Sequence, residues 1–536
     1  MKLINFVFAF LVFTAMSIII SYWAGWVHLN PPLILVVSLF SSYFLWKNYA
    51  SKIELEIPKI VWLLALIVVA VNAYPLLLLT PNYQASADPL HSVLLRVIDE
   101  KIPETFAPYS DLKLSYAIGF HLFVNNFAEL FPMLPDYLWN WFFGLIFSGL
   151  QVVFFYLFAK ALTQNENAAM LSAFLFVGAK TLFQNFLFGL MPWILATLLF
   201  FVFMIFFLQK NPLTYLFFPV VFMLHPGASF NMVLFLGLFV FFYREHLKSF
   251  LMHLPSLIIA LPAILNAYLI LIISLLNDPS KTAFSFSKFV EAFAPLPLWV
   301  GLIPSIVLVV AVIFAVKEKQ FNKFNFFLVF SLLISIVLFG YFAATQGLLF
   351  GKIVELISFL AIIFASVVLM NSEFEFFGLI EKNKKLIFSI ILIVCVFSIV
   401  SSSYLNSLRE GDKISKEEAG FAFAFKQFDS GREKALILSN GSSKIAELAD
   451  KIPFNPARDY FLYYSEQVSV KDAAFFELGK INALWEKIVY TNCMECIEQI
   501  DVKYVVVNRD FQNLRGLELN RQKLFSFGNF DVYSVS

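Results

Sequence analysis

The sequence predicts a polytopic α-helical membrane protein of about thirteen spans, followed by a small extracytoplasmic α/β domain. Hydrophobic residues make up 60% of the 536 residues and charged residues only 14%, whereas a soluble domain carries about a quarter charged residues. The composition then changes abruptly near residue 404, where long apolar runs give way to short mixed segments. We therefore divide the chain into a membrane domain, residues 1–403, and a soluble domain, residues 404–536.

Each expected span is an apolar run of a length suited to a hydrocarbon core of ~30 Å. The first is a retained span rather than a signal peptide, because its apolar run is longer than a signal-peptide core and no small-residue cleavage site follows cleanly. The shortest are 32–47 and 212–226. The predicted spans are residues 3–25, 32–47, 60–80, 137–160, 168–188, 190–208, 212–226, 229–245, 250–275, 298–316, 325–345, 353–371 and 384–403.

Basic residues indicate the orientation of these spans. With the amino terminus inside, Lys and Arg gather in the turns that face the cytoplasm, as the positive-inside rule requires. Residues 114–131 are apolar but carry His121, Asn125, Asn126 and Glu129, so we expect an amphipathic helix in the outer interface rather than a span. An odd number of spans then places the first large loop, residues 81–136, and the carboxyl-terminal domain outside the cytoplasm.

The polar part of this loop, residues 81–113, holds the main candidates for chemistry. Its charged or titratable side chains are Asp88, His91, Arg96, Asp99, Glu100 and Asp111. Asp88 directly follows a span and precedes Pro89, with His91 three residues further on. A carboxylate held at the membrane surface and partly desolvated has a raised pKa that suits a general base. The alternative is that Asp88 caps a helix beginning at Pro89.

Further polar groups interrupt the apolar spans, where a charge is costly unless it faces a cavity or a partner. By the orientation above, all of them lie towards the outer side. Each has an alternative: Lys180 could reach the interface as a snorkelling side chain, His225 could belong to an ordinary turn before Pro226, and Lys352 could pair locally with Glu355. The groups are Lys180, Gln184, His225, Gln346, Lys352 and Glu355.

The soluble domain reads as alternating helices and strands. We expect helices at 415–428, 443–451 and 471–489, strands at 434–439 and 503–508, and a hairpin at 524–535 that turns at Gly528-Asn529. Cys493 and Cys496 form a CxxC sequence without a later His to complete a zinc site. A short-loop disulfide or two free thiols are the remaining interpretations.

A large first outer loop that opens with an acidic residue, followed by many spans and an α/β tail, resembles the GT-C class of integral-membrane glycosyltransferases. Residues 88–123, DPLHSVLLRVIDEKIPETFAPYSDLKLSYAIGFHLF, resemble the loop of its bacterial and archaeal branch. Residues 141–162, WFFGLIFSGLQVVFFYLFAKAL, resemble the span that follows in that branch. The similarity in order covers most of the chain. It departs from the class in that the loop follows the third span and offers a single acid at Asp88.

The resemblance implies a sugar donor linked to polyprenyl or dolichyl phosphate, transferred with inversion to a glycan, lipid or protein acceptor. It makes Asp88 the general base, with Asp111 as its substitute and His91 as a neighbour that orients the base or contacts the acceptor. Arg96, Lys180 and Lys352 would then stabilise the departing phosphate, and Gln184, His225, Gln346 and Glu355 would line the cavity. Oligosaccharyltransferase-like members need a divalent metal, so a divalent metal is a possible cofactor, but no acidic pair in the sequence is strong enough to assign it a site.

Three other functions remain open. A ligase or polymerase would join preassembled glycans, a transporter or flippase would move lipid-linked glycans, and a scaffold would lack activity. A transporter predicts corresponding halves and charges near the midplane, which the sequence does not show. The net charge of +1 is uninformative about partners, and the sequence shows no basic patch suited to nucleic acid.

Overall fold

The computed structural model forms two compact units: Met1–Ala73, Glu100–Ile102 and Ser115–Tyr404 make the first, and Tyr74–Asp99, Pro103–Leu114 and Leu405–Ser536 make the second. The boundary at Tyr404 coincides with the change in composition, while most of the first large loop groups with the carboxyl-terminal segment. The structure describes residues 3–28, 30–50, 55–79, 95, 98, 102, 105–106, 110–113, 117–131, 136–179, 190–268, 285–294, 296–320, 322–345, 350–371, 415–431, 433–439, 445–446, 449, 451–453, 487, 494–498, 502–510 and 521–535.

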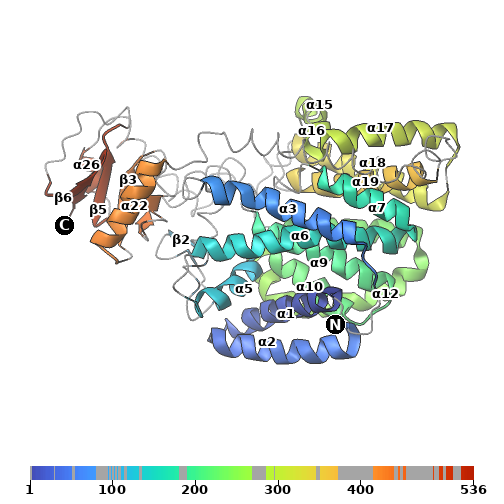
Figure 1. Cartoon of the computed structure of the whole chain (residues 1–536), viewed down its shortest axis with the longest axis horizontal. Helices are drawn as coiled ribbons and strands as arrows, with labels where there is room; N and C mark the ends of the chain where they lie inside the picture. Colours follow the sequence, from blue (N-terminus) through green and yellow to red (C-terminus); the bar gives the residue numbers. More distant parts are fainter. Residues whose placement is uncertain are drawn as a thin grey trace. The chain divides into compact units, whose positions relative to one another are not determined.

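The first unit is built of helices (Figure 1). They are α1 (Leu3–Ala24), α2 (Pro31–Leu45), α3 (Lys59–Leu79), α5 (Gly119–Ala128), α6 (Asp136–Thr163), α7 (Glu166–Val177), α9 (Met191–Leu208), α10 (Thr214–Leu224), α11 (Pro226–Phe242), α12 (Leu247–His253), α13 (Leu261–Ala263), α15 (Phe286–Phe293), α16 (Leu296–Val300), α17 (Leu302–Lys317), α18 (Lys323–Ala344) and α19 (Phe350–Met370). Short π or 3₁₀ segments adjoin α2 and the α11–α13 region: η1 (Trp46–Ala50), η2 (Arg244–His246), η3 (Leu254–Ala260) and η4 (Ile264–Tyr268).

Helix occurs at every predicted span that the described residues cover, and residues 384–403 lie outside them. Within the described part, six helices are long and apolar enough to cross a membrane, or seven if α11 and Arg244–Ala263, bent by 120°, form one span. Helices α7, α10 and α17 have 12, 11 and 16 residues. At a rise of about 1.5 Å per residue they are shorter than a ~30 Å core. The number of about thirteen spans is therefore not confirmed.

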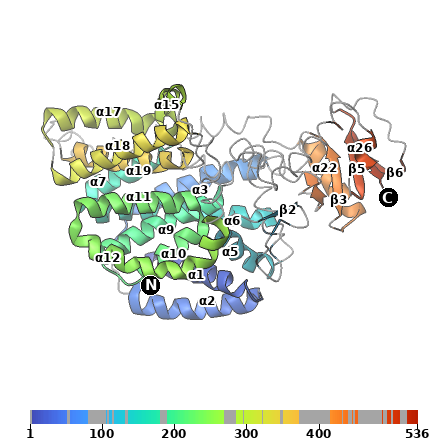
Figure 2. The ribbon, with the colours of Figure 1, turned by 180° about the vertical axis from the view of Figure 1, so that it is seen from behind.

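Helix α9 forms the centre of the first unit. Every residue from Met191 to Phe207 is buried, because α5, α6, α10 and α11 all pack against this helix. Both views show α9 between α6 and α10 (Figures 1 and 2). Aromatic rings fill the space around it: the Phe201 ring lies 5.3 Å from that of Phe155 and 4.9 Å from that of Phe359. An apolar helix without a polar face is the expected sequence for such an enclosed position.

Helix α5 differs from the expected interfacial helix. Its ten residues are too few to span, as predicted, but Gly119–Asn126 are all buried, so no polar face of this stretch is exposed. The amide of Asn126 donates to Ser17 Oγ at 3.1 Å and to Ser21 Oγ at 2.9 Å, both on α1. The polar residues thus serve contacts between helices, in contrast to the polar face towards water that an interfacial helix would present.

The carboxyl-terminal domain contains helix α22 (Lys416–Phe428) beside a five-stranded mixed sheet of order β4-β3-β5-β7-β6. The strands are β3 (Lys434–Leu438), β4 (Ile452–Pro453), β5 (Tyr504–Asn508), β6 (Lys523–Phe527) and β7 (Phe530–Ser534). Strands β3, β4 and β5 are parallel, whereas β7 is antiparallel to β5 and β6.

These elements confirm the predicted first helix, both strands and the hairpin. Ser415 and Glu418 close the start of α22 as a reciprocal capping box, and the Phe421 ring stacks on Phe530 of β7 at 4.4 Å. Strand β4 was not predicted. The expected helices at 443–451 and 471–489 lie largely outside the described residues. Cys496, in the short helix α26 (Met494–Glu498), is disulfide-bonded, and Cys493 lies outside the described residues.

Candidate functional site

The structure places only some of the predicted site residues. Asp111 belongs to β2 (Ser110–Lys113), which pairs antiparallel with β1 (Thr105–Phe106), and Lys352 belongs to the first turn of α19. Only the backbone of these two residues is described. His225 and Glu355 are described in full. The predicted residues outside the described part are Asp88, His91, Arg96, Lys180, Gln184 and Gln346.

Glu355 is a buried acid on α19, with only 3% of its surface exposed. The hydroxyl of Thr197, on α9, donates to its Oε2 at 3.1 Å. Burying a carboxyl group among apolar helices is costly without such partners, so an acid in this position usually serves a function. The contact joins residues 158 positions apart in the sequence. Sequence reasoning selected Glu355 but missed Thr197, whose only signal was a hydroxyl within an apolar run.

His225 separates α10 from α11 and caps the second of them. Its Nδ1 accepts a hydrogen bond from the Gly227 N–H at 3.1 Å, so the other ring nitrogen carries the proton when the imidazole is neutral. The ring stands perpendicular to that of Trp193, with their centroids 4.8 Å apart. The alternative of an ordinary turn before Pro226 is therefore consistent with the geometry.

His225 and Glu355 contact the same strip of α9. Their partners there, Trp193 and Thr197, are four residues apart and so lie about one helical turn from each other on one face. The side-chain amide of Gln151, on α6, donates to the Ile194 carbonyl in the same stretch at 2.9 Å. The first turns of α9 therefore collect polar contacts from α6, from α19 and from the α10–α11 junction.

The α10–α11 junction is a turn at one extended residue, His225, and hydroxyls satisfy the carbonyl groups beside it. Pro226 has no N–H to donate to the Phe222 carbonyl, and Tyr268 Oη donates to it instead at 2.8 Å. Tyr22 Oη donates to the Met223 carbonyl at 3.3 Å, and Ser229 Oγ to the Val221 carbonyl at 3.1 Å. Breaks in helices among lipid-embedded structure require such partners. The chain thus provides a stable break where His225 lies.

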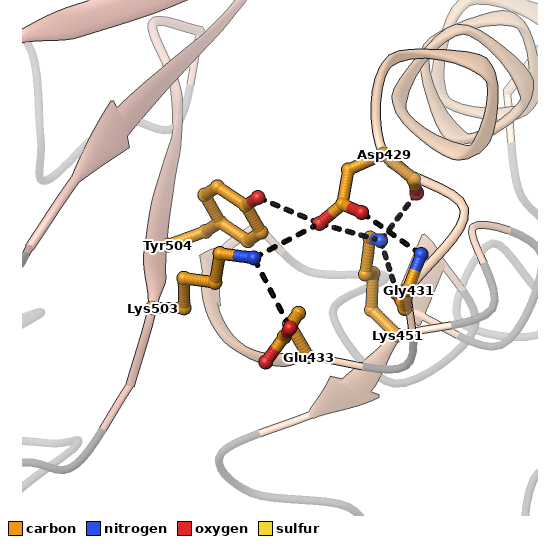
Figure 3. A network of polar contacts seen from close by, with 6 residues as sticks. All are labelled: Asp429, Gly431, Glu433, Lys451, Lys503 and Tyr504. Atoms are coloured by element: carbon orange, nitrogen blue, oxygen red, sulfur yellow. Dashed lines mark hydrogen bonds and ion pairs between the residues drawn. The ribbon is translucent and has the colours of Figure 1, made fainter.

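A second polar network lies in the carboxyl-terminal domain and was not predicted (Figure 3). The ammonium of Lys451, which is 1% exposed, donates to the carbonyls of Asp429 and Gly431 and lies 3.3 Å from Asp429 Oδ2. Tyr504 Oη donates to the same carboxylate oxygen at 2.6 Å. Two carbonyl oxygens and one carboxylate oxygen surround the ammonium, so the network stabilises the fold.

This network makes the domain sensitive to acid. Burial by itself raises the pKa of Asp429, but hydrogen bonds from Tyr504 and the Gly431 N–H, with the charge of Lys451, lower that pKa to about 2. A depressed carboxyl pKa stabilises the fold above the unfolded-state value, near 3.9, and this stabilisation is lost as the pH falls towards the folded value. We expect the free energy of unfolding to decline between about pH 5 and pH 2, and to decline less in Asp429→Asn. The free energy of unfolding is measured by denaturant titration of both proteins at each pH. An equal decline with falling pH in the two proteins would contradict this prediction.

The described residues contain no group of three His, Cys, Asp or Glu side chains that could hold a metal ion. The structure therefore does not place the divalent metal that the resemblance allows. No family model matches this chain, and no curated protein matches it.

Proposed function

We propose that this protein is a membrane glycosyltransferase that moves a sugar from a polyprenyl- or dolichyl-phosphate carrier to an extracytoplasmic acceptor. The observation that carries the proposal is the order of residues 88–123, an acid followed by His91 and a Pro/Tyr segment leading into a Gly-Phe-His helix, which resembles the GT-C loop. The apolar helical unit supports it, because a carrier lipid cannot leave the bilayer and its enzyme must act at the membrane surface.

In this mechanism Asp88 takes the proton from the acceptor hydroxyl as that oxygen attacks the anomeric carbon. The bond from that carbon to the carrier phosphate breaks, and the configuration inverts. Cationic side chains stabilise the negative charge that develops on the departing phosphate; Arg96, Lys180 and Lys352 are proposed for this role. The buried contact between Glu355 and Thr197 supports a polar site within the helical unit. The sugar of the donor, rather than its phosphate, would use such a site.

One observation favours a second candidate, a transporter or flippase of lipid-linked glycans. Carriers bind their substrates at discontinuous helices, and the 120° bend between α11 and Arg244–Ala263, together with the buried acid Glu355, has that character. The two functions differ in what they require. A flippase needs two compartments separated by a sealed membrane, whereas a transferase consumes its donor in detergent solution.

The proposed mechanism requires the loop and the carboxyl-terminal domain to lie outside the cytoplasm. Variants with a single cysteine in place of Ser92 or Ser443 are expressed in cells. In intact cells, we expect both cysteines to react with a membrane-impermeant maleimide added from outside. Matched cysteines at Lys210 and Arg244, which begin turns predicted to face the cytoplasm, should react only after the cells are opened. Labelling of Ser92 from the cytoplasmic side alone would overturn both the topology and the mechanism.

The test of the function is donor consumption by the purified protein in detergent, using a panel of radiolabelled polyprenyl-phosphate sugars with a mixture of glycan, lipid and peptide acceptors. Transfer of one labelled sugar, inhibited by the same carrier phosphate without sugar, would support the proposal and show that the phosphate is recognised. Movement of label across sealed vesicles without transfer would favour the flippase.

A further inference from the structure

The end of α1 contacts the first large loop through a backbone hydrogen bond. Gly25, just beyond α1, accepts at its carbonyl from the Ile102 N–H at 2.9 Å. Both residues belong to the helical unit, whereas the flanking segments Tyr74–Asp99 and Pro103–Leu114 group with the other unit. The loop thus returns to the helical unit at Ile102, within the stretch that carries its predicted chemistry.

Gly25 allows this approach because it has no side chain. A β-carbon at this position would lie 2.5 Å from Ile102 Cγ1, closer than real β-carbons come to another atom, and 3.0 Å from Ile102 Cδ1, which is a tight contact. Its backbone does not have the positive φ that favours glycine. The requirement for glycine here is therefore space for Ile102 and not backbone conformation.

A second contact fixes the end of the loop one turn earlier on α1. The Ile118 N–H, at the start of α5, donates to Tyr22 Oη at 2.7 Å, and the same hydroxyl donates to the Met223 carbonyl. Tyr22 is 1% exposed. Gly119 packs so closely on the Met223 carbonyl oxygen that a β-carbon there would collide with it. The Tyr22 hydroxyl therefore joins Ile118, at the end of the loop, to Met223, at the end of α10.

Two apolar residues upstream of Ile102, in the other compact unit, are also buried. Leu95 and Ile98 are each 3% exposed, although they lie in the polar part of the first large loop, residues 81–113. A solvated loop would leave such side chains exposed. Their burial shows that this part of the loop packs against protein.

We propose that the carboxyl end of α1 is a two-point anchor, with Gly25 holding Ile102 and Tyr22 holding Ile118, that positions the loop for sugar transfer. The role in transfer rests on the proposed function, in which this loop carries the general base Asp88. These residues touch neither donor nor acceptor; they act by holding the chain at Ile102 and Ile118, which lie on either side of Asp111 in the sequence. Misplacing a catalytic group by about 1 Å can cost about 100-fold in rate.

The anchor is tested first without activity. A disulfide should form in the double variant Gly25→Cys, Ile102→Cys of the full-length protein. A β-carbon at position 25 lies 2.5 Å from Ile102 Cγ1, so the two β-carbons are within about 4 Å of each other, and disulfides have a mean β-carbon separation of about 3.8 Å. Trypsin should cleave after Lys101 faster in Gly25→Ala than in the parent protein, and adding Ile102→Ala should restore the slower cleavage. Gly237→Ala, in α11, is the matched control, because a β-carbon there meets no atom within 4 Å.

Transfer assays then test positioning. Gly25→Ala should lower kcat about 10- to 100-fold with little change in the donor KM, Ile102→Ala should restore most of the turnover to that variant, and Gly237→Ala should match the parent. Absence of the disulfide, or unchanged cleavage, would overturn the anchor. Full turnover in Gly25→Ala, or no recovery in the double variant, would overturn positioning. If the parent protein transfers no sugar, the proposed function fails, while crosslinking and cleavage still decide the anchor.

Discussion

Replacing Asp88 with Asn is expected to abolish sugar transfer while leaving the protein folded and inserted in the membrane. An amide has nearly the shape of a carboxylate but does not accept the acceptor's proton. A positioned general base typically contributes about 10²- to 10⁴-fold to the rate, so the loss should fall in that range. The measurement is the initial rate of transfer from the donor that the panel identifies.

Asp111→Asn is the matched control, because Asp111 lies in the same loop and is the substitute for the base. If Asp88 is the base, Asp111→Asn should retain most of the activity. The reverse pattern would assign the base to Asp111, whose backbone lies in β2. Full activity in both variants, with both proteins correctly inserted, would remove the loop-carboxylate mechanism.

Replacing Lys451 with Met is expected to cause the largest loss of stability in the carboxyl-terminal domain. Methionine keeps most of the stem, which lies over the Phe425 ring with Nζ 5.2 Å from the ring centroid, but it removes the ammonium group. The carbonyls of Asp429 and Gly431 then lose a buried donor and the Asp429 carboxylate loses its closest cation. Breaking a buried pair by removing one partner costs about 3–5 kcal/mol.

Lys503→Met is the control for this prediction. Lys503 contacts the same cluster, 3.7 Å from Asp429 Oδ2 and 3.1 Å from Glu433 Oε1, but 42% of its side chain is exposed. Exposed ion pairs contribute little to stability, so this variant should unfold close to the parent protein. Hydrogen exchange of peptides from β3 and β5 in the full-length protein would measure both effects. Equal protection in the two variants would show that burial does not distinguish the lysines.

Local sequence was sufficient to predict most of the secondary structure. The apolar runs of α1, α6, α9, α18 and α19 are long enough that hydropathy alone marks them as helices suited to a membrane. The strand at 504–508 is rich in β-branched residues, and Gly528, with φ of 54°, permits the predicted hairpin turn. The number of spans was less accessible, because α7 and α10 end earlier than their apolar runs suggest, and helix ends depend on neighbouring elements.

The candidate site divides in the same way. The sequence by itself determined which polar groups stand out, His225 and Glu355 among them, because a charge or imidazole in an apolar run is visible without a structure. Only the tertiary structure decided which residues these groups contact. Thr197, the partner of Glu355, lies 158 residues away from it, and Tyr22, which donates to the Met223 carbonyl near His225, lies 201 residues away from Met223. Helix formation depends on bonds between residues four apart, whereas the cost of an unpaired polar group in an apolar interior is met by whichever distant helix packs beside it.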